Sequence, residues 1–296
     1  MPTQSSEAVQ HRLPSKALEV ADQSLEAMLR GFLIKAHLSD EPTTEVFARL
    51  TAGITLPDLV VEYPILPRPV RLKQCFVEMD EAGDCTGGLL WDSSSMLLDW
   101  LSCNPAARLL FEGQTVLELG GGIGLVSISL ALLGASRVIL TDGHQSACAR
   151  ATANIELNQV GDRVGVAKLR WGDGPEAADQ TEAALQHIGS AGLCAQTVVA
   201  SDVLYDPEGI HLLELTLRSL IARGGCTHVV IGWRDRGWDE SAFLRRLSHL
   251  GCVHTAWTML PMDAVDDETR KDADGLRNRG VSVLTVGESE GQPSLA

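Results

Sequence analysis

The feature that most limits how this chain can fold is a glycine-rich turn between an apolar strand and an apolar helix. Residues 115–119 are β-prone, residues 120–124 read Gly-Gly-Gly-Ile-Gly, and mainly apolar residues follow up to Gly134. Glycine adopts backbone angles that other residues avoid, and it leaves room for a ligand close to the main chain. Such a strand, turn and helix are typical of an open α/β sheet that binds a nucleotide-like ligand at the carboxyl ends of its strands.

Strand-like and helix-like segments alternate beyond this turn, which is typical of a parallel sheet covered on both faces. Strands are predicted at residues 115–119, 137–142, 163–169, 196–201, 227–233, 252–259 and 281–286. Helices are predicted at residues 92–101, 124–133, 144–157, 180–188, 209–222 and 239–249, with a polar loop at 263–280. We therefore expect an α/β fold that is Rossmann-like, with a seven-stranded, mostly parallel sheet and helices on both faces.

The first sixty residues have a different pattern. Apolar residues recur every three or four positions in 16–36, which predicts an amphipathic helix, and a second helix is predicted within 40–53. Short β-prone runs broken by prolines at 60–79 indicate a hairpin. The predicted organisation is an N-terminal helical extension at 1–60, an α/β domain at 61–290 and a C-terminal tail at 291–296.

Charge and composition exclude several classes of protein. The formal net charge of -15 argues against binding to nucleic-acid phosphates or anionic lipid, which needs clustered Lys and Arg. No stretch approaches the roughly 20 apolar residues that span a bilayer, and the N-terminus lacks the apolar core of a signal peptide. The seven cysteines include no C-x-x-C pair, so neither a disulfide framework nor a metal site is indicated. We expect a cytoplasmic protein with no direct nucleic-acid or membrane partner.

The spacing of the glycine turn separates two candidate ligands, a dinucleotide and S-adenosylmethionine. A dinucleotide site needs G-x-G-x-x-G, but the sixth position counted from Gly120 is a leucine, and counted from Gly122 it is Ser127. The chain instead has Glu118 two residues before the first glycine, and its last turn glycine is Gly124. A carboxylate there would repel pyrophosphate but could orient the cationic amino-acid end of S-adenosylmethionine, directly or through water.

Two acidic residues follow other predicted strands. Asp142 ends the strand after the glycine turn, where a carboxylate can accept hydrogen bonds from both ribose hydroxyls of either ligand. Taken alone, an acid in this position also fits a turn or a helix cap. Asp202 follows the fourth predicted strand in the sequence Asp-Val-Leu-Tyr, which ends at Tyr205. A strand end with a capping Asp and a packed Tyr is the simpler interpretation of that tetrapeptide.

These motifs together resemble the class I S-adenosylmethionine-dependent methyltransferases, and among them the protein-lysine methyltransferases that carry Asp-x-x-Tyr after strand four. The chain is most similar to the eukaryotic elongation factor 2 lysine methyltransferase family in TGGLLWD (86–92), NPAA (104–107), 116–125, 142–144 and 201–208. The departures are Gly121 and Ile123 in the glycine turn and an acidic insert around 175–182. The resemblance identifies the α/β domain as a methyltransferase domain.

The resemblance also implies roles for individual residues. Trp91 and Trp171 would line the cofactor pocket, with Trp171 against the adenine. Gly120, Gly121 and Gly122 would cradle the methionine portion, Asp142 would bind the ribose, and Ser201 would approach the cofactor through its backbone. Asp202 would attract the incoming ammonium, and Tyr205 would frame the acceptor channel and orient the nitrogen lone pair. Without the family, both tryptophans would be placed in the core.

The function expected from the sequence is methyl transfer from S-adenosylmethionine to a lysine of a protein, with elongation factor 2 as the expected substrate. One rival is a methyltransferase that acts on another protein or on a small-molecule amine. A rival of another class is a non-catalytic module that binds the cofactor or a partner protein. The intact cofactor and acceptor motifs disfavour the non-catalytic module, and the sequence leaves the oligomeric state open.

Overall fold

The computed structural model describes residue 56 and residues 58–75, 86–187, 195–234, 240–259 and 279–286. The helices predicted for the N-terminal extension and the tail at 291–296 lie outside the described residues, as does the predicted loop at 263–280 except for its last two residues. Within the described part of the chain, no helix has both the length and the apolar character needed to cross a bilayer.

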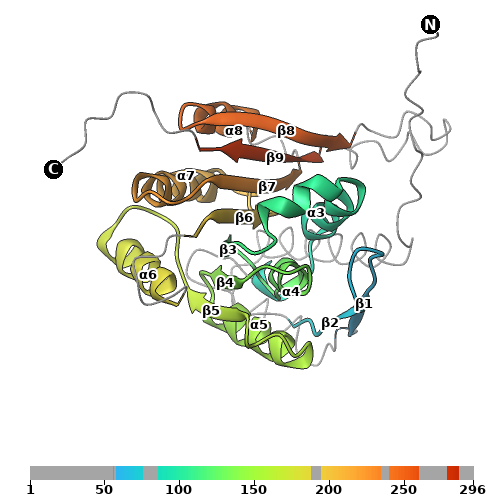
Figure 1. The fold of residues 1–296 in the computed structure, drawn as a ribbon. Helices are drawn as coiled ribbons and strands as arrows, with labels where there is room; N and C mark the ends of the chain where they lie inside the picture. The colour runs from blue at the N-terminus through green and yellow to red at the C-terminus, as the bar shows by residue number, and fades with distance from the viewer. Residues whose placement is uncertain are drawn as a thin grey trace, which may run out of the picture. The chain divides into compact units, whose positions relative to one another are not determined.

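Seven strands form one sheet with the order β5-β4-β3-β6-β7-β9-β8 (Figure 1). The strands are β3 (Thr115–Leu119), β4 (Arg137–Asp142), β5 (Val164–Lys168), β6 (Thr197–Ser201), β7 (His228–Arg234), β8 (Cys252–Met259) and β9 (Arg279–Thr285). The strands from β5 to β7 pair in parallel, and β9 is antiparallel to both of its neighbours. The predicted seven-stranded, mostly parallel sheet is therefore confirmed, and β9 is its reversed strand.

The strand order changes direction between β3 and β6. The chain moves outward from β3 through β4 to β5, and then returns to place β6 on the opposite side of β3. The carboxyl ends of these two neighbours diverge into the turns after Leu119 and Ser201. Open α/β sheets bind ligands at such a switch point, so the fold places the glycine turn where a ligand site is expected.

Helices cover both faces of the sheet, as predicted. The helices of one face are α3 (Asp92–Cys103), α4 (Leu125–Leu132) and α5 (Gln145–Leu157), and those of the other are α6 (Pro175–Gln186), α7 (Pro207–Ala222) and α8 (Glu240–Ser248). The side chains of β3 distinguish the two faces, because successive side chains of a strand point to opposite faces of the sheet. Glu118 bonds to Ser127 of α4, whereas Leu117 belongs to the apolar cluster that contains α7.

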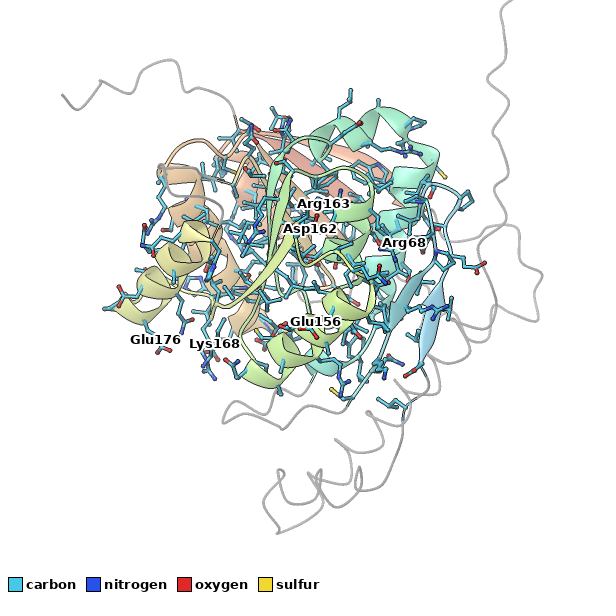
Figure 2. The ribbon with its side chains drawn as sticks, turned by 60° about the horizontal axis from the view of Figure 1, so that its bottom comes forward. Arg68, Glu156, Asp162, Arg163, Lys168 and Glu176 are labelled. Carbon is cyan, nitrogen blue, oxygen red and sulfur yellow. The ribbon has the colours of Figure 1, made fainter. Side chains whose placement is uncertain are left out.

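The predicted hairpin is present as a two-stranded antiparallel pair, β1 (Leu59–Val61) and β2 (Val70–Leu72). Both strands are three residues long, since the prolines between them cannot donate to a ladder. The hairpin lies against α4 and α5. Figure 2 labels Arg68, which lies in the loop between the two strands. Its Nη2 donates to the carbonyl oxygen of Asn158 at the end of α5.

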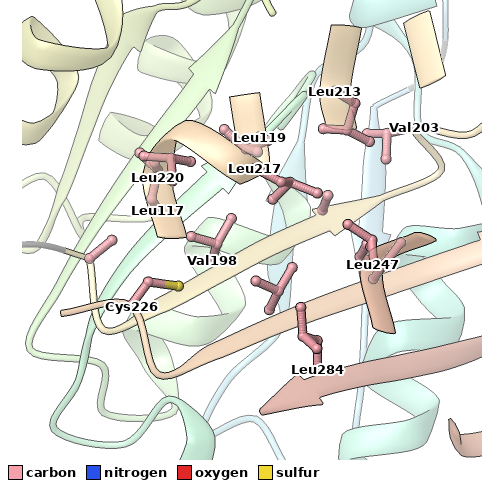
Figure 3. Packing of buried hydrophobic residues seen from close by; sticks show 14 of the residues in the cluster. Leu117, Leu119, Val198, Val203, Leu213, Leu217, Leu220, Cys226, Leu247 and Leu284 are labelled. Atoms are coloured by element: carbon pink, nitrogen blue, oxygen red, sulfur yellow. The ribbon is translucent and has the colours of Figure 1, made fainter. Parts of the chain in front are cut away.

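An apolar cluster holds the second face together. It joins leucines of α7 with β-strand residues and with Leu247 of α8 (Figure 3). Leu213 and Leu217, one turn apart on α7, are fully buried against it, as are Leu117 and Val198 of the sheet. Because the cluster also includes Val203, it extends to the turn after β6 and anchors that turn against the sheet.

Two helices begin earlier than the sequence predicted. The helix predicted at 180–188 begins at Pro175, so the acidic insert forms its first two thirds, and the helix predicted from 209 begins at Pro207. Proline suits the first helical position, where its missing N–H is not needed. Glu176 and Glu208 in the two first turns interact favourably with the positive end of the helix dipole.

Candidate active site

The glycine turn brings together residues from three strands at the switch point. Gly120 has φ +67°, a left-handed conformation, and a Cβ added there would lie 2.9 Å from Val203 Cγ1 and 3.0 Å from Trp171 Cζ2. Val203 follows β6 and Trp171 follows β5. Only glycine allows the main chain to approach both side chains, so the turn, Trp171 and the segment after β6 share one wall.

Glu118 lies beneath the glycine turn and is 1% exposed. Its Oε2 accepts hydrogen bonds from the Ser127 N–H at 3.0 Å and from the Ser127 hydroxyl. Ser127 is in the first turn of α4, where N–H groups lack partners within the helix. A Cβ added at Gly121 would lie 3.0 Å from Glu118 Cδ, so Glu118 supports the turn from below. Its expected interaction with the methionine end of the cofactor stays a prediction.

Burial determines the protonation of Glu118. Desolvation raises the pKa of the carboxyl from 4.5 to about 8, although the hydrogen bonds from Ser127 lower it and the nearby Asp142 raises it further. Glu118 is therefore mostly protonated at neutral pH. In the sequence, Ser127 occupies the position where a dinucleotide site would have its third glycine. Its bonds to Glu118 could not be predicted from that position.

Asp142 connects two turns at the carboxyl edge of the sheet and is 7% exposed. Its Oδ2 accepts from the Gly122 N–H at 3.0 Å, and its Oδ1 accepts from the His144 N–H at 2.9 Å. His144 is the N-cap residue of α5 and makes no capping bond with its side chain, so Asp142 holds the turn that leads into α5 and does not cap the helix. A carboxylate can accept about four hydrogen bonds, so the two from the main chain do not exhaust it.

Gly87 lies in the TGGLLWD motif but is not among the site residues predicted from the sequence. The short 3-10 helix η1 (Thr86–Gly88) covers Asp142, because a Cβ added at Gly87 would lie 3.4 and 3.6 Å from the two carboxylate oxygens. The Gly87 carbonyl oxygen lies 3.2 Å from the Cβ position of Gly122. The glycine pair in TGGLLWD was the signal that could have identified this close approach.

The two tryptophans occupy different environments. Trp171 is half-buried against the apolar cluster, and its ring lies between Gly120 and Gly209 of α7. It is therefore a core residue and a wall of the site at once. Trp91 is half-buried at the position that precedes α3, and its carbonyl oxygen accepts the Ser94 N–H at 3.1 Å. The start of α3 reaches β6, since the Ser94 and Ser201 hydroxyls are 2.9 Å apart.

The segment after β6 carries an aspartate, Asp202, at the carboxyl edge of the sheet. The Asp202 N–H donates to the Gly232 carbonyl oxygen at 3.0 Å, and the residue is 7% exposed with φ +59°. Among residues other than glycine, Asp and Asn adopt this left-handed conformation most readily, and such residues concentrate at functional sites. Tyr205 is half-buried three residues later, just before α7. The sequence did not indicate the roles of Ser94 and Gly232.

No group of three or more His, Cys, Asp or Glu side chains in the described ranges is arranged to hold a metal ion. The polar groups next to the glycine turn are main-chain amides, the Ser127 hydroxyl and the carboxyl groups of Glu118 and Asp142. These groups suit an organic ligand with hydroxyl and amine functions.

The strand order, the single reversed strand and the glycine turn after β3 define a class I methyltransferase fold. The solved structure of SMU.776 complexed with SAH has a TM-score of 0.51 to this chain, with 15% identity, and the match covers 79% of this chain and 57% of that one. At this identity the similarity concerns the fold alone. A family model described as lysine methyltransferase matches residues 73–250, more than half of the chain. The chain therefore belongs to the lysine methyltransferase family, whose cofactor is S-adenosylmethionine.

Curated relatives agree with this assignment. The protein-lysine N-methyltransferase EEF2KMT of Homo sapiens is 34% identical over 149 residues, which are 46% of this chain and 41% of that protein. The protein N-lysine methyltransferase METTL21A of Danio rerio is 30% identical over 189 residues, which are 63% of this chain and 76% of that protein. The chain thus spans about two-fifths of the length of its human relative.

Proposed function

We propose that this chain transfers a methyl group from S-adenosylmethionine to a lysine side chain of a protein. The observation that carries the proposal is the contact between the cofactor turn and the acceptor motif. Val203, the neighbour of Asp202, lies against Gly120 so closely that any Cβ at position 120 would collide with it. A cofactor held on the glycine turn would therefore be adjacent to the Asp202 segment.

The residues of the site fit this cofactor. The turn offers main chain without side chains at Gly120, Gly121 and Gly122, and Asp142 lies next to it with a carboxylate suited to ribose hydroxyls. Trp171 has an aromatic ring beside Gly120 for the adenine, and Trp91 and Ser201 flank the start of α3. Bound there, S-adenosylmethionine supplies an electrophilic methyl group on a sulfonium sulfur.

Asp202 and Tyr205 would handle the acceptor amine. A lysine has a reference pKa near 10.4, so it arrives as an ammonium and must lose a proton before it can attack. The buried Asp202 carboxylate attracts that cation, and desolvation in the site lowers the pKa of the amine. Tyr205 would limit the directions from which the amine can approach, and alignment contributes most to such a displacement.

Elongation factor 2 is the first candidate substrate. Its support is the resemblance to the elongation factor 2 lysine methyltransferase family and the 34% identity to EEF2KMT over 149 residues. METTL21A, a relative with another name, is also 30% identical, so a lysine of another protein is the alternative acceptor. A cytoplasmic location follows from the same substrate assignment.

The decisive experiment supplies the purified full chain with methyl-labelled S-adenosylmethionine and either purified elongation factor 2 or a cell lysate. We expect label on a lysine of elongation factor 2, located by mass spectrometry, and none with the Asp202→Asn variant. Label on a lysine of another protein would refute elongation factor 2 as the substrate but would still support lysine methylation as the reaction. Label on a small molecule would refute the protein acceptor, and cofactor binding without any transfer would favour the non-catalytic module.

A further inference from the structure

Asn154 of α5 and Asn158, the residue that ends this helix, pair with the main chain of β2 and of the residue after it as a neighbouring strand would. Asn154 Oδ1 accepts the Lys73 N–H at 2.9 Å, and Nδ2 donates to the Lys73 carbonyl oxygen at 3.1 Å. Asn158 Oδ1 accepts the Arg71 N–H at 2.9 Å, and Nδ2 donates to the Arg71 carbonyl oxygen at 2.6 Å. Both asparagines are almost fully buried, at 0% and 1% exposed.

The spacing of helix and strand makes this double pairing possible. Four residues of α-helix rise about 6 Å, and two residues of extended strand span about 6.6 Å. Residues two apart in a strand direct their N–H and C=O groups to the same side. Asn154 and Asn158 therefore match Arg71 and Lys73, and the helix satisfies main-chain groups that would otherwise be unpaired.

The second amide proton distinguishes the two asparagines. Asn158 gives it to the Asn154 carbonyl oxygen within the helix, at 2.7 Å. Asn154 gives it to the carbonyl oxygen of Ile123 in the glycine turn, at 2.9 Å. The next N–H along the chain, that of Gly124, donates to the Gly121 carbonyl oxygen at 2.9 Å. The peptide group between Ile123 and Gly124 is thus held at both ends.

The segment held by Asn154 also reaches the opposite wall of the site. The Cys75 N–H donates to the Gly88 carbonyl oxygen at 3.0 Å, and the Leu90 N–H donates to Gln74 Oε1 at 3.0 Å. This segment therefore holds the end of η1, whose Gly87 covers Asp142. Through Lys73 and Ile123, the one amide of Asn154 connects the element above Asp142 with the turn beside it.

We infer that Asn154 is a positioning residue for the cofactor: it holds the glycine turn and the segment leading to η1 at the separation that cofactor binding requires. All three of its amide hydrogen bonds are used for this purpose. Asn158 stabilises the same hairpin without any bond to the glycine turn. The two asparagines therefore separate a contribution to cofactor affinity from a contribution to stability.

The test compares Asn154→Ala with Asn158→Ala in the full chain, without any need for the protein substrate. Both variants lose two bonds to the hairpin, and we expect comparable decreases in the thermal unfolding midpoint. By calorimetry, S-adenosylhomocysteine should bind at least about tenfold more weakly to Asn154→Ala, but within about twofold of wild type to Asn158→Ala. Amide hydrogen exchange in residues 120–124 of the cofactor-free protein should accelerate in Asn154→Ala alone.

Two outcomes would overturn the inference. One is an equal loss of S-adenosylhomocysteine affinity in both alanine variants, and the other is unchanged exchange in the glycine turn of Asn154→Ala. If Asn154→Ala does not fold, Asn154→Asp provides the same comparison at pH 8, against Asn158→Asp. Each carboxylate still accepts the hairpin N–H, but only Asn154→Asp loses a donor to Ile123 and places a negative charge against its carbonyl oxygen. Equal affinities of these two variants would likewise refute the inference.

Discussion

Asp142 and Gly122 are joined by a hydrogen bond of 3.0 Å from the Gly122 N–H to the Asp142 Oδ2 atom. The other oxygen of the carboxylate accepts the N–H of His144 at the start of α5. One side chain therefore holds the turn after β3 and the turn after β4 in a common arrangement. Any ribose hydroxyl bound by Asp142 would meet a carboxylate that the main chain has already oriented.

Replacing Asp142 should therefore weaken cofactor binding first. We expect Asp142→Ala to bind S-adenosylhomocysteine at least tenfold more weakly, about 1.4 kcal/mol, since it loses the ribose acceptor and leaves two N–H groups without their partner. Asp142→Asn keeps one acceptor oxygen, so its affinity for S-adenosylhomocysteine should lie between those of Asp142→Ala and wild type. Calorimetry measures both. Asp162→Ala is the control, because Asp162 is 74% exposed and pairs only with Arg163 at 3.8 Å among the ion pairs of the described residues. Wild-type affinity in Asp142→Ala would exclude the proposed role.

Asp202 should behave in the opposite way. Asn has nearly the same shape as Asp and tolerates the left-handed backbone at this position, so Asp202→Asn should keep the unfolding midpoint of wild type. Its affinity for S-adenosylhomocysteine should remain within about tenfold, roughly 1.4 kcal/mol, while kcat falls by at least about a hundredfold, typical of a lost acid-base or electrostatic group. Single-turnover kinetics with saturating cofactor measure the effect, and full activity would remove Asp202 from the acceptor site.

Gly120 and Gly113 have similar backbone conformations but differ in the space available for a side chain. Both have left-handed φ values, +67° and +72°, but nothing lies within 4 Å of a Cβ added at Gly113. Gly113→Ala should cost only the conformational strain, about 1–2 kcal/mol, and keep cofactor affinity. Gly120→Ala should cost about 1–3 kcal/mol more because of the collision with Val203 and Trp171, and should weaken binding of S-adenosylhomocysteine. Urea unfolding measures the stability of both variants, and calorimetry measures their affinity for S-adenosylhomocysteine. Equal stability and equal affinity of the two variants would contradict the predicted effect of crowding at Gly120.

Glu118 should make stability depend on pH. Its pKa is about 8 in the folded protein and 4.5 when exposed, so between these values the folded state holds a proton that the unfolded chain has lost. The contribution of Glu118 to the free energy of unfolding is fully present below pH 4.5 and is lost as the pH rises to about 8. Relative to Glu118→Gln, which does not titrate, wild type should become less stable from pH 5 to pH 9.

Unfolding of both proteins in urea at pH 5, 7 and 9 isolates this group, because the other titrating residues cancel in the difference. A difference that stays constant across this range would show that burial does not raise the pKa of Glu118, because a pKa at or below 4.5 would change the difference only below about pH 5.

Local sequence patterns predicted most of the elements. The alternation of apolar and turn residues located all seven strands of the sheet to within a few residues, because each depends on its own periodicity. The same reasoning began α6 and α7 too late, since each helix starts with proline and glutamate followed by alanine or glycine, which show no apolar periodicity. It could not determine that β9 lies between β7 and β8, because the direction and neighbours of a strand depend on packing between distant segments.

The candidate site divides in the same way. The sequence predicted the glycine turn and Asp142 as site residues from their positions at strand ends, which must lie along one edge of the sheet, and the family resemblance added Asp202. Only the tertiary structure decided that Val203 and Trp171 meet at Gly120 and that Asn154 reaches both Lys73 and Ile123. These contacts join residues separated by about 30 to 80 positions, and no local pattern encodes the distance between them. The physical reason is that the local sequence determines which residues lie in a turn at the end of a strand. The packing of the helices and the hairpin on the sheet determines which side chains are in contact.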